Sequence, residues 1–156
     1  MLCITGIVLA TKRPGSILRL SKRRPGREDP SNTAHGGGEI RSEFTPLPDE
    51  IVAQEHWCSS GFANTDLDLL LKRHGIHKLI TIGLIAHTSM ESTVRFAAEL
   101  GYEVTVVKDA TADYSDKEMH AALDINLPSY ANAIMTTLEM VQSISSLTPL
   151  KAGARE

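Results

Sequence analysis

The feature that most constrains the fold is an apolar run near the middle of the chain. Lys78 to Ile85 reads K-L-I-T-I-G-L-I, which is rich in β-branched residues and apolar at both odd and even positions. A strand that is apolar on both faces is typical of a parallel sheet with helices on both sides. We therefore expect an α/β domain built around this strand.

Strand and helix patterns alternate around this run. Leucines at helical spacing precede it, and Ser115 with Glu118 has the spacing of a capping box. Alternating strands and helices joined by short loops predict three layers, a mostly parallel sheet with helices on both faces. The other predicted elements are strands at 51–53, 103–107 and 133–135 and helices at 66–73, 89–100, 115–124 and 137–145.

Charge and composition divide the chain. Its 156 residues suit one core, and the net charge is −3, yet residues 1–42 carry eight Lys or Arg against three acids. Proline and glycine interrupt residues 12–38. We expect a basic, irregular segment over 1–35, the folded domain over 36–147 and a tail over 148–156. The missing or altered part of the domain then lies at the N-terminal end.

The acid-free stretch from Lys12 to Arg27 has three interpretations. It is a solvated tail, a mitochondrial-type presequence or a nucleic-acid patch, and the last is disfavoured because no aromatic residues are interleaved for base stacking. No apolar run is long enough for a membrane span. Two cysteines, Cys3 and Cys58, form no disulfide framework. We expect a cytoplasmic protein, with a mitochondrial location as the alternative.

The chemistry is expected where the central strand ends. In open α/β sheets ligands bind at the carboxyl ends of the strands, and here the strand turns at Gly83 into a helix that we expect to begin at Ser89, at the mouth of a cleft. A cysteine at such a helix start is a good nucleophile because the helix N-terminus favours thiolate. Serine is a weaker nucleophile unless a base takes its proton. From local sequence alone, Ser89 is an ordinary helix N-cap.

Three segments together resemble the isochorismatase-like cysteine hydrolases. E-I-V-A-Q-E-H-W-C-S-S-G-F-A-N-T-D-L-D at 50–68 is similar to that family's lysine-loop region, and G-L-I-A-H-T-S-M-E-S-T at 83–93 is similar to its nucleophile elbow. E-L-G-Y-E-V-T-V-V-K-D-A-T-A at 99–112 resembles the helix–strand unit that follows. The resemblance covers roughly residues 36–142.

The resemblance implies a doubly wound α/β fold without a cofactor. Members use an Asp general base, a Lys and a Cys nucleophile to hydrolyse amide or ureido bonds of small molecules, while isochorismatases proper cleave a vinyl ether. Many assemble as dimers or larger oligomers. The expected partners are therefore a small-molecule substrate and further copies of the chain, with no nucleic acid and no membrane.

The chain departs from this pattern at all three catalytic positions. Ser89 occupies the nucleophile position and His56 falls at or beside the lysine position. Histidine does not supply a lysine's fixed positive charge at neutral pH. The Asp-Met-Gln-like segment that carries the base is absent, and residues 4–10, which contain no acid, are a candidate substitute strand.

Other residues are assigned by the same resemblance. It implies a cis peptide between Leu84 and Ile85 and oxyanion-type N–H groups on Ile85 and Ser89. It also places Trp57 and Phe62 against the pocket, although Trp57 suits an ordinary core equally well.

The roles of further polar residues are inferred from the amino-acid sequence pattern and not from the resemblance. Asn64 and Thr65 are expected to cap the helix that follows them, and Asp109 to hydrogen-bond a loop. The spacing of His56, His87 and His120 is not that of metal ligands, so we expect no metal site. A Ser–His–Asp triad through Asp109 is a minor alternative.

These observations predict an isochorismatase-like hydrolase of a small amide or carbamoyl compound, inactive or impaired at Ser89. The serine is either natural or introduced to trap a substrate. The alternative is a non-catalytic binding or oligomerisation module on the same fold. A further possibility is that residues 1–35 come from an aberrant gene model or splice form.

Overall fold

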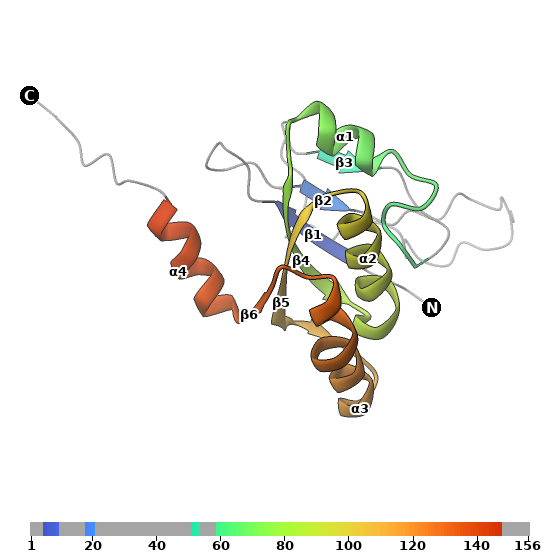
Figure 1. Cartoon of the computed structure of the whole chain (residues 1–156), viewed down its shortest axis with the longest axis vertical. Helices are drawn as coiled ribbons and strands as arrows, with labels where there is room; N and C mark the ends of the chain where they lie inside the picture. The colour runs from blue at the N-terminus through green and yellow to red at the C-terminus, as the bar shows by residue number, and fades with distance from the viewer. Residues whose placement is uncertain (1–4, 10–17, 21–50, 54–58, 148–156) are drawn as a thin grey trace, which may run out of the picture.

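The fold is taken from a computed structural model, which describes residues 5–9, 18–20, 51–53 and 59–147. Figure 1 shows a sheet seen nearly edge-on with helices packed beside it. Within the described ranges no helix is both long and apolar enough to cross a bilayer. The predicted His56 and Trp57 lie outside the described residues.

The main sheet has four strands in the order β1-β4-β5-β6. β4, β5 and β6 run parallel, whereas β1 pairs antiparallel with β4, so the sheet is mostly parallel, as predicted. A second, two-stranded sheet pairs β2 with β3. The strands are β1 (Thr5–Leu9), β2 (Leu18–Leu20), β3 (Ile51–Ala53), β4 (Lys78–Leu84), β5 (Glu103–Ala112) and β6 (Ala133–Met135).

β4 is the predicted central strand, with β1 on one side and β5 on the other. Leu79, Ile80 and Thr81 are all buried, which explains why consecutive positions of this strand are apolar or small. β5 was predicted to end at Val107 because polar residues follow, but it continues to Ala112. The pairing of β4 with β5 shifts register between Thr81 and Gly83, and the strand resumes beyond that shift.

Helices flank the sheet on both sides, which confirms the three-layer prediction. Figure 1 shows α1, α2 and α3 on one side and α4 on the other. Two π-helical turns, η2 and η3, adjoin α2 and α3. The helical segments are α1 (Leu67–Arg73), η2 (Ala86–Met90), α2 (Glu91–Glu99), α3 (Asp116–His120), η3 (Ala121–Asn126), the 3-10 turn η4 (Leu127–Ser129) and α4 (Thr137–Leu147).

The core lies between the sheet, helices α1 and α2 and the turns η3 and η4. Leu71 of α1 and Val94 of α2 are fully buried against strand residues such as Val104. Gly75 follows α1 with φ +64°, as expected of a glycine after a helix C-terminus. Ser115 caps α3 by accepting a hydrogen bond from the Glu118 backbone N–H at 3.4 Å. The sequence predicted both helix ends.

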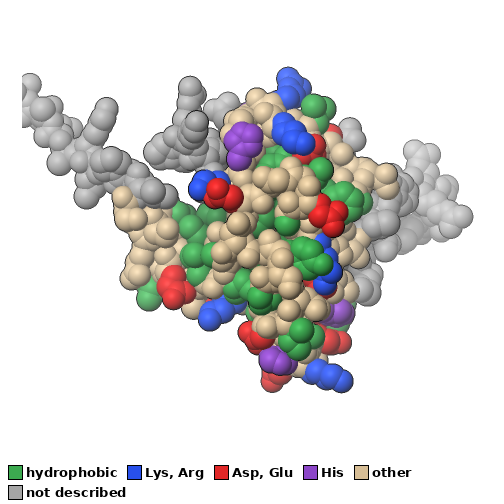
Figure 2. Space-filling model, in the orientation of Figure 1, with side chains coloured by type: hydrophobic (Ala, Val, Ile, Leu, Met, Phe, Trp, Pro, Cys, Tyr) green, Lys and Arg blue, Asp and Glu red, His purple; other side chains and the backbone are tan. Residues whose placement is uncertain are grey.

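α4 differs from the other helices because its apolar residues face solvent. Leu138 is 66% exposed and Val141 is 53% exposed. Figure 2 shows acidic and basic side chains scattered among apolar ones on the face of the domain that is turned toward the viewer in Figure 1. On that face the described residues form no continuous basic patch.

Candidate active site at the carboxyl end of β4

The turn after β4 has the backbone geometry that the family resemblance implied. The Leu84–Ile85 peptide bond is cis, which confirms that prediction. Ile85 has an extended backbone and is buried, and η2 begins at the next residue. The Ile85 carbonyl accepts the Met90 N–H at 3.1 Å, five residues on, which makes the turn π-helical. Single π-helical turns are frequent at functional sites.

Ser89 lies inside this turn and is not a helix N-cap, which corrects the simplest sequence interpretation. Helical backbone already begins at Ala86, three residues earlier, and α2 begins at Glu91 after Met90, which is itself helical. Ser89 is 1% exposed, so its side chain does not open to solvent as we expected. Its Oγ has no hydrogen-bond partner among the described residues.

An unpaired buried hydroxyl is costly and informative. Leaving such a group without a partner costs about 1–3 kcal/mol. Such groups in native structures call for an explanation, and a binding or catalytic role is one of them. The Ser89 hydroxyl therefore marks the turn between β4 and α2 as the candidate site.

Phe62 lies in the hydrophobic core. Its ring stacks on Phe96 at 6.4 Å between centroids and lies 5.6 Å from the ring of Tyr102. Its assignment to a substrate pocket, like the oxyanion roles of Ile85 and Ser89, stays a prediction.

Two further predictions concern the polar residues Thr65 and Asp109. α1 begins at Leu67 with Asp66 as its N-cap, one residue later than expected, and Thr65 Oγ1 accepts the backbone N–H of Leu67 at 3.3 Å. The capping role of Asn64 stays a prediction. Asp109 accepts both the N–H and the hydroxyl of Thr137 at 2.7 and 2.8 Å, so it forms hydrogen bonds as expected, but its partner is the first residue of α4 and not a loop. These bonds from Thr137 hold the pKa of the Asp109 carboxyl below its usual value. Asp109 lies within β5 and not at its end.

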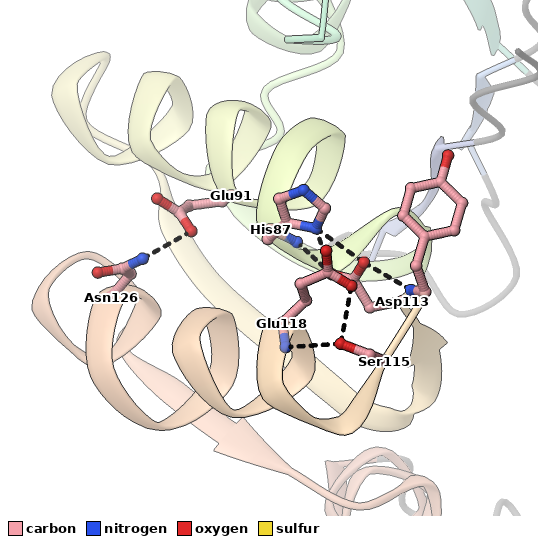
Figure 3. A network of polar contacts seen from close by, with 7 residues as sticks. His87, Glu91, Asp113, Ser115, Glu118 and Asn126 are labelled. Atoms are coloured by element: carbon pink, nitrogen blue, oxygen red, sulfur yellow. Dashed lines mark hydrogen bonds and ion pairs between the residues drawn. The ribbon is translucent and has the colours of Figure 1, made fainter.

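The acid that contacts the turn is Asp113, which the sequence analysis did not single out. Its carboxylate accepts the His87 backbone N–H at 2.8 Å and lies 2.7 Å from His87 Nδ1. It also accepts the Tyr114 N–H at 2.7 Å. Leu84 pairs with Ala112 in the sheet, which brings Asp113 beside the turn (Figure 3). The position after the last residue of β5 was the available signal, and it was missed because β5 was predicted too short.

Burial and hydrogen bonding have opposite effects on the pKa of the Asp113 carboxyl. Its side chain is 0% exposed, and burial by itself would raise the pKa of its carboxyl. The hydrogen bonds from His87 and Tyr114 outweigh that effect and hold the pKa below its usual value. Asp113 is therefore a buried carboxylate that stays ionised because the turn donates to it.

Other carboxylates surround this pair. Glu118 offers an oxygen that lies, together with atoms of His87 and Asp113, in a group spanning no more than 4.8 Å, and it accepts the Ser115 hydroxyl at 2.9 Å. Glu91, at the start of α2, accepts the Asn126 amide at 3.0 Å and pairs with Arg95 at 2.5 Å. Figure 3 shows these side chains between η2, α2 and α3. The turn after β4 therefore carries two buried hydroxyl oxygens, on Thr88 and Ser89, that are unpaired among the described residues, and its His87 lies beside carboxylates.

Comparison with known proteins identifies the scaffold. Residues 8–139 match the family model of the isochorismatase domain. The chain is 30% identical over 129 residues to an uncharacterized isochorismatase family protein, YwoC, of Bacillus subtilis, covering 78% of this chain and 66% of that protein. It is 32% identical over 111 residues to the ureidoacrylate amidohydrolase RutB of Caulobacter segnis, covering 71% of this chain and 46% of RutB. The chain thus spans less than two thirds of the length of these relatives.

Solved structures of isochorismatase-like proteins have a similar fold. An isochorismatase-like hydrolase from Alkaliphilus metalliredigens superposes with a TM-score of 0.71 at 27% identity, covering 85% of this chain and 75% of that one. A cysteine hydrolase from Pseudomonas syringae pv. phaseolicola also gives 0.71, at 22% identity and with 85% and 73% coverage. The second similarity concerns the fold alone.

Proposed function

The chain belongs to the isochorismatase family of proteins, and we propose that it is a hydrolase of the C–N bond of a small amide or carbamoyl compound with impaired turnover. The observation that carries this proposal is the buried, unpaired hydroxyl of Ser89 on the π-helical turn after the cis peptide. The resemblance assigns a cysteine thiol to that position. A relative named ureidoacrylate amidohydrolase supports the substrate class.

Impairment follows from the chemistry of a serine in this setting. A hydroxyl attacks a carbonyl efficiently only when a neighbouring base accepts its proton. Ser89 Oγ donates to no described acceptor, and the sequence of β1, T-G-I-V-L, contains no acid. His87 is the nearest histidine in sequence, and its Nδ1 is engaged by Asp113. We therefore expect slow hydrolysis at best.

The test restores the thiol. Ser89→Cys is compared with the unaltered protein for hydrolysis of ureido and carbamoyl compounds, followed by ammonia release. Ser92→Cys, three residues further on in α2, is the matched control because it adds the same thiol on the same segment. We expect a gain in rate for Ser89→Cys alone. Efficient hydrolysis by the unaltered protein would disprove the impairment. Inactivity of Ser89→Cys would show that the impairment comes from the missing Asp and Lys and not from the serine.

The alternative is a non-catalytic binding or oligomerisation module, and the exposed apolar residues of α4 favour oligomerisation. Leu138 and Val141 are both exposed, and Figure 1 shows their helix, α4, at the edge of the domain. We propose that a second copy of the chain covers them. Analytical ultracentrifugation of Leu138→Glu is expected to show a smaller species than the unaltered protein. An unaltered protein that sediments as a monomer would contradict this proposal.

The expected cytoplasmic location of the protein stays a prediction.

A further inference from the structure

Three side chains that could hold a metal ion converge beside the turn that carries Ser89. His87 comes from η2, Asp113 directly follows β5 and Glu118 comes from α3. One ligand atom from each lies within 4.8 Å of the others. Figure 3 shows the two carboxylates turned toward the His87 ring. The cluster thus brings one imidazole and two carboxylates together from three separate elements.

We propose that His87, Asp113 and Glu118 bind a divalent transition-metal ion, with Zn²⁺ the best fit. Zn²⁺ takes nitrogen and oxygen ligands at about 2.0–2.2 Å and commonly uses three protein ligands, which leaves a position for water. The present span is somewhat wider than such bonds require. His87 Nδ1 and Asp113, by contrast, stand 2.7 Å apart, closer than two ligands of one ion, so binding requires a small shift of the His87 ring as well as rotation of the partly buried Glu118.

The remaining contacts hold the ligands in place. The His87 and Tyr114 N–H groups donate to different oxygens of Asp113, and both bonds stay intact when an ion binds. The Ser115 hydroxyl donates to one oxygen of Glu118, which leaves the other oxygen to turn toward the ion. Such outer contacts are what metal-binding carboxylates ordinarily make. The ion takes the place of the proton between His87 Nδ1 and Asp113, and that proton leaves to solvent.

Charge also favours a cation at this point. Two carboxylates face one imidazole, so the cluster is negative whether or not the ring is protonated. In the described part of the chain neither Asp113 nor Glu118 pairs with a lysine or arginine, whereas Glu91 nearby has Arg95. A bound divalent ion would be the largest local charge and would neutralise this excess.

The test is a Co²⁺ titration of the full, tag-free chain followed by visible absorption. Co²⁺ substitutes for Zn²⁺ and reports its ligands, because thiolate ligation by Cys3 or Cys58 adds a charge-transfer band that an imidazole–carboxylate site lacks. We expect one Co²⁺ per chain without that band. Glu118→Gln should weaken binding at least about tenfold, and His87→Gln should abolish it.

The matched control is the exposed His120–Asp124 pair, 2.8 Å apart on α3 and η3, which has no third ligand within the described part of the chain. His120→Gln with Asp124→Asn should leave the affinity within about twofold. Circular dichroism establishes that each variant is folded. No Co²⁺ uptake by the unaltered protein at millimolar metal would overturn the proposal. So would a thiolate band, or a Glu118→Gln affinity equal to that of the unaltered protein.

Discussion

Asp113 ties the turn after β4 to the segment after β5. Its buried carboxylate accepts two backbone N–H groups, from His87 and Tyr114. We predict that Asp113→Ala lowers the free energy of unfolding by about 2–4 kcal/mol, because these donors lose a charged acceptor. Urea denaturation in the presence of EDTA measures this without a metal contribution.

Asp124→Ala is the matched control for that measurement. Asp124 also contacts a histidine at 2.8 Å, but both side chains are 65% exposed. Exposed pairs of this kind contribute little, so the control should change stability by less than about 0.5 kcal/mol. Equal effects of the two substitutions would show that burial of Asp113 is unimportant.

Tyr102 gives the fold a sensitivity to alkali. Burial, and then its hydrogen bond to Asp68 at 2.8 Å, raise the pKa of the Tyr102 hydroxyl above its usual value. A raised pKa favours the folded state while the hydroxyl is protonated. This contribution is complete below about pH 10, the ordinary tyrosine value, and is lost as pH rises beyond it.

We therefore predict that Tyr102→Phe destabilises the protein more at pH 8 than at pH 10.5. Urea denaturation at the two pH values measures the difference. Tyr114→Phe is the control, because Tyr114 is 63% exposed. A Tyr102→Phe cost that stays constant between the two pH values would contradict the linkage.

At the scale of elements, α1 tests how the helices hold to the sheet. Leu71 is fully buried, whereas Leu69 on the same helix is 59% exposed. We predict that Leu71→Ala costs about 2–5 kcal/mol of unfolding free energy, since it leaves a cavity in the core. Leu69→Ala should cost less than about 0.5 kcal/mol. Thermal unfolding of both variants compares them, and similar losses would mean that α1 packs differently.

The pattern of apolar residues in the sequence predicted those elements in which successive residues are buried. β4 was recognisable because Leu79, Ile80 and Thr81 are buried in succession. The π-helical turn at 86–90 was not recognisable. The spacing of apolar residues does not distinguish a hydrogen bond between residues five apart from the bond between residues four apart in an ordinary first helical turn. That single difference moved Ser89 from a capping position into the interior of the turn.

For the whole molecule, local patterns predicted the topology better than the site. Parallel pairing of β4 with β5 followed from alternation of strands and helices. The contact between His87 and Asp113 spans 26 residues and depends on where β5 ends, which the polar pair Lys108 and Asp109 obscured. The antiparallel direction of β1 had no local signal, because an apolar strand of five residues suits either orientation.

The central claim is that residue 89 occupies the position of the nucleophile. Intact-mass and peptide mass spectrometry of Ser89→Cys, quenched during reaction with a carbamoyl compound, tests it most directly. We predict an acyl adduct on the peptide that contains residue 89, and none on the unaltered protein or on Ser92→Cys. An adduct confined to Cys58, or one equally present on the unaltered protein, would contradict the claim.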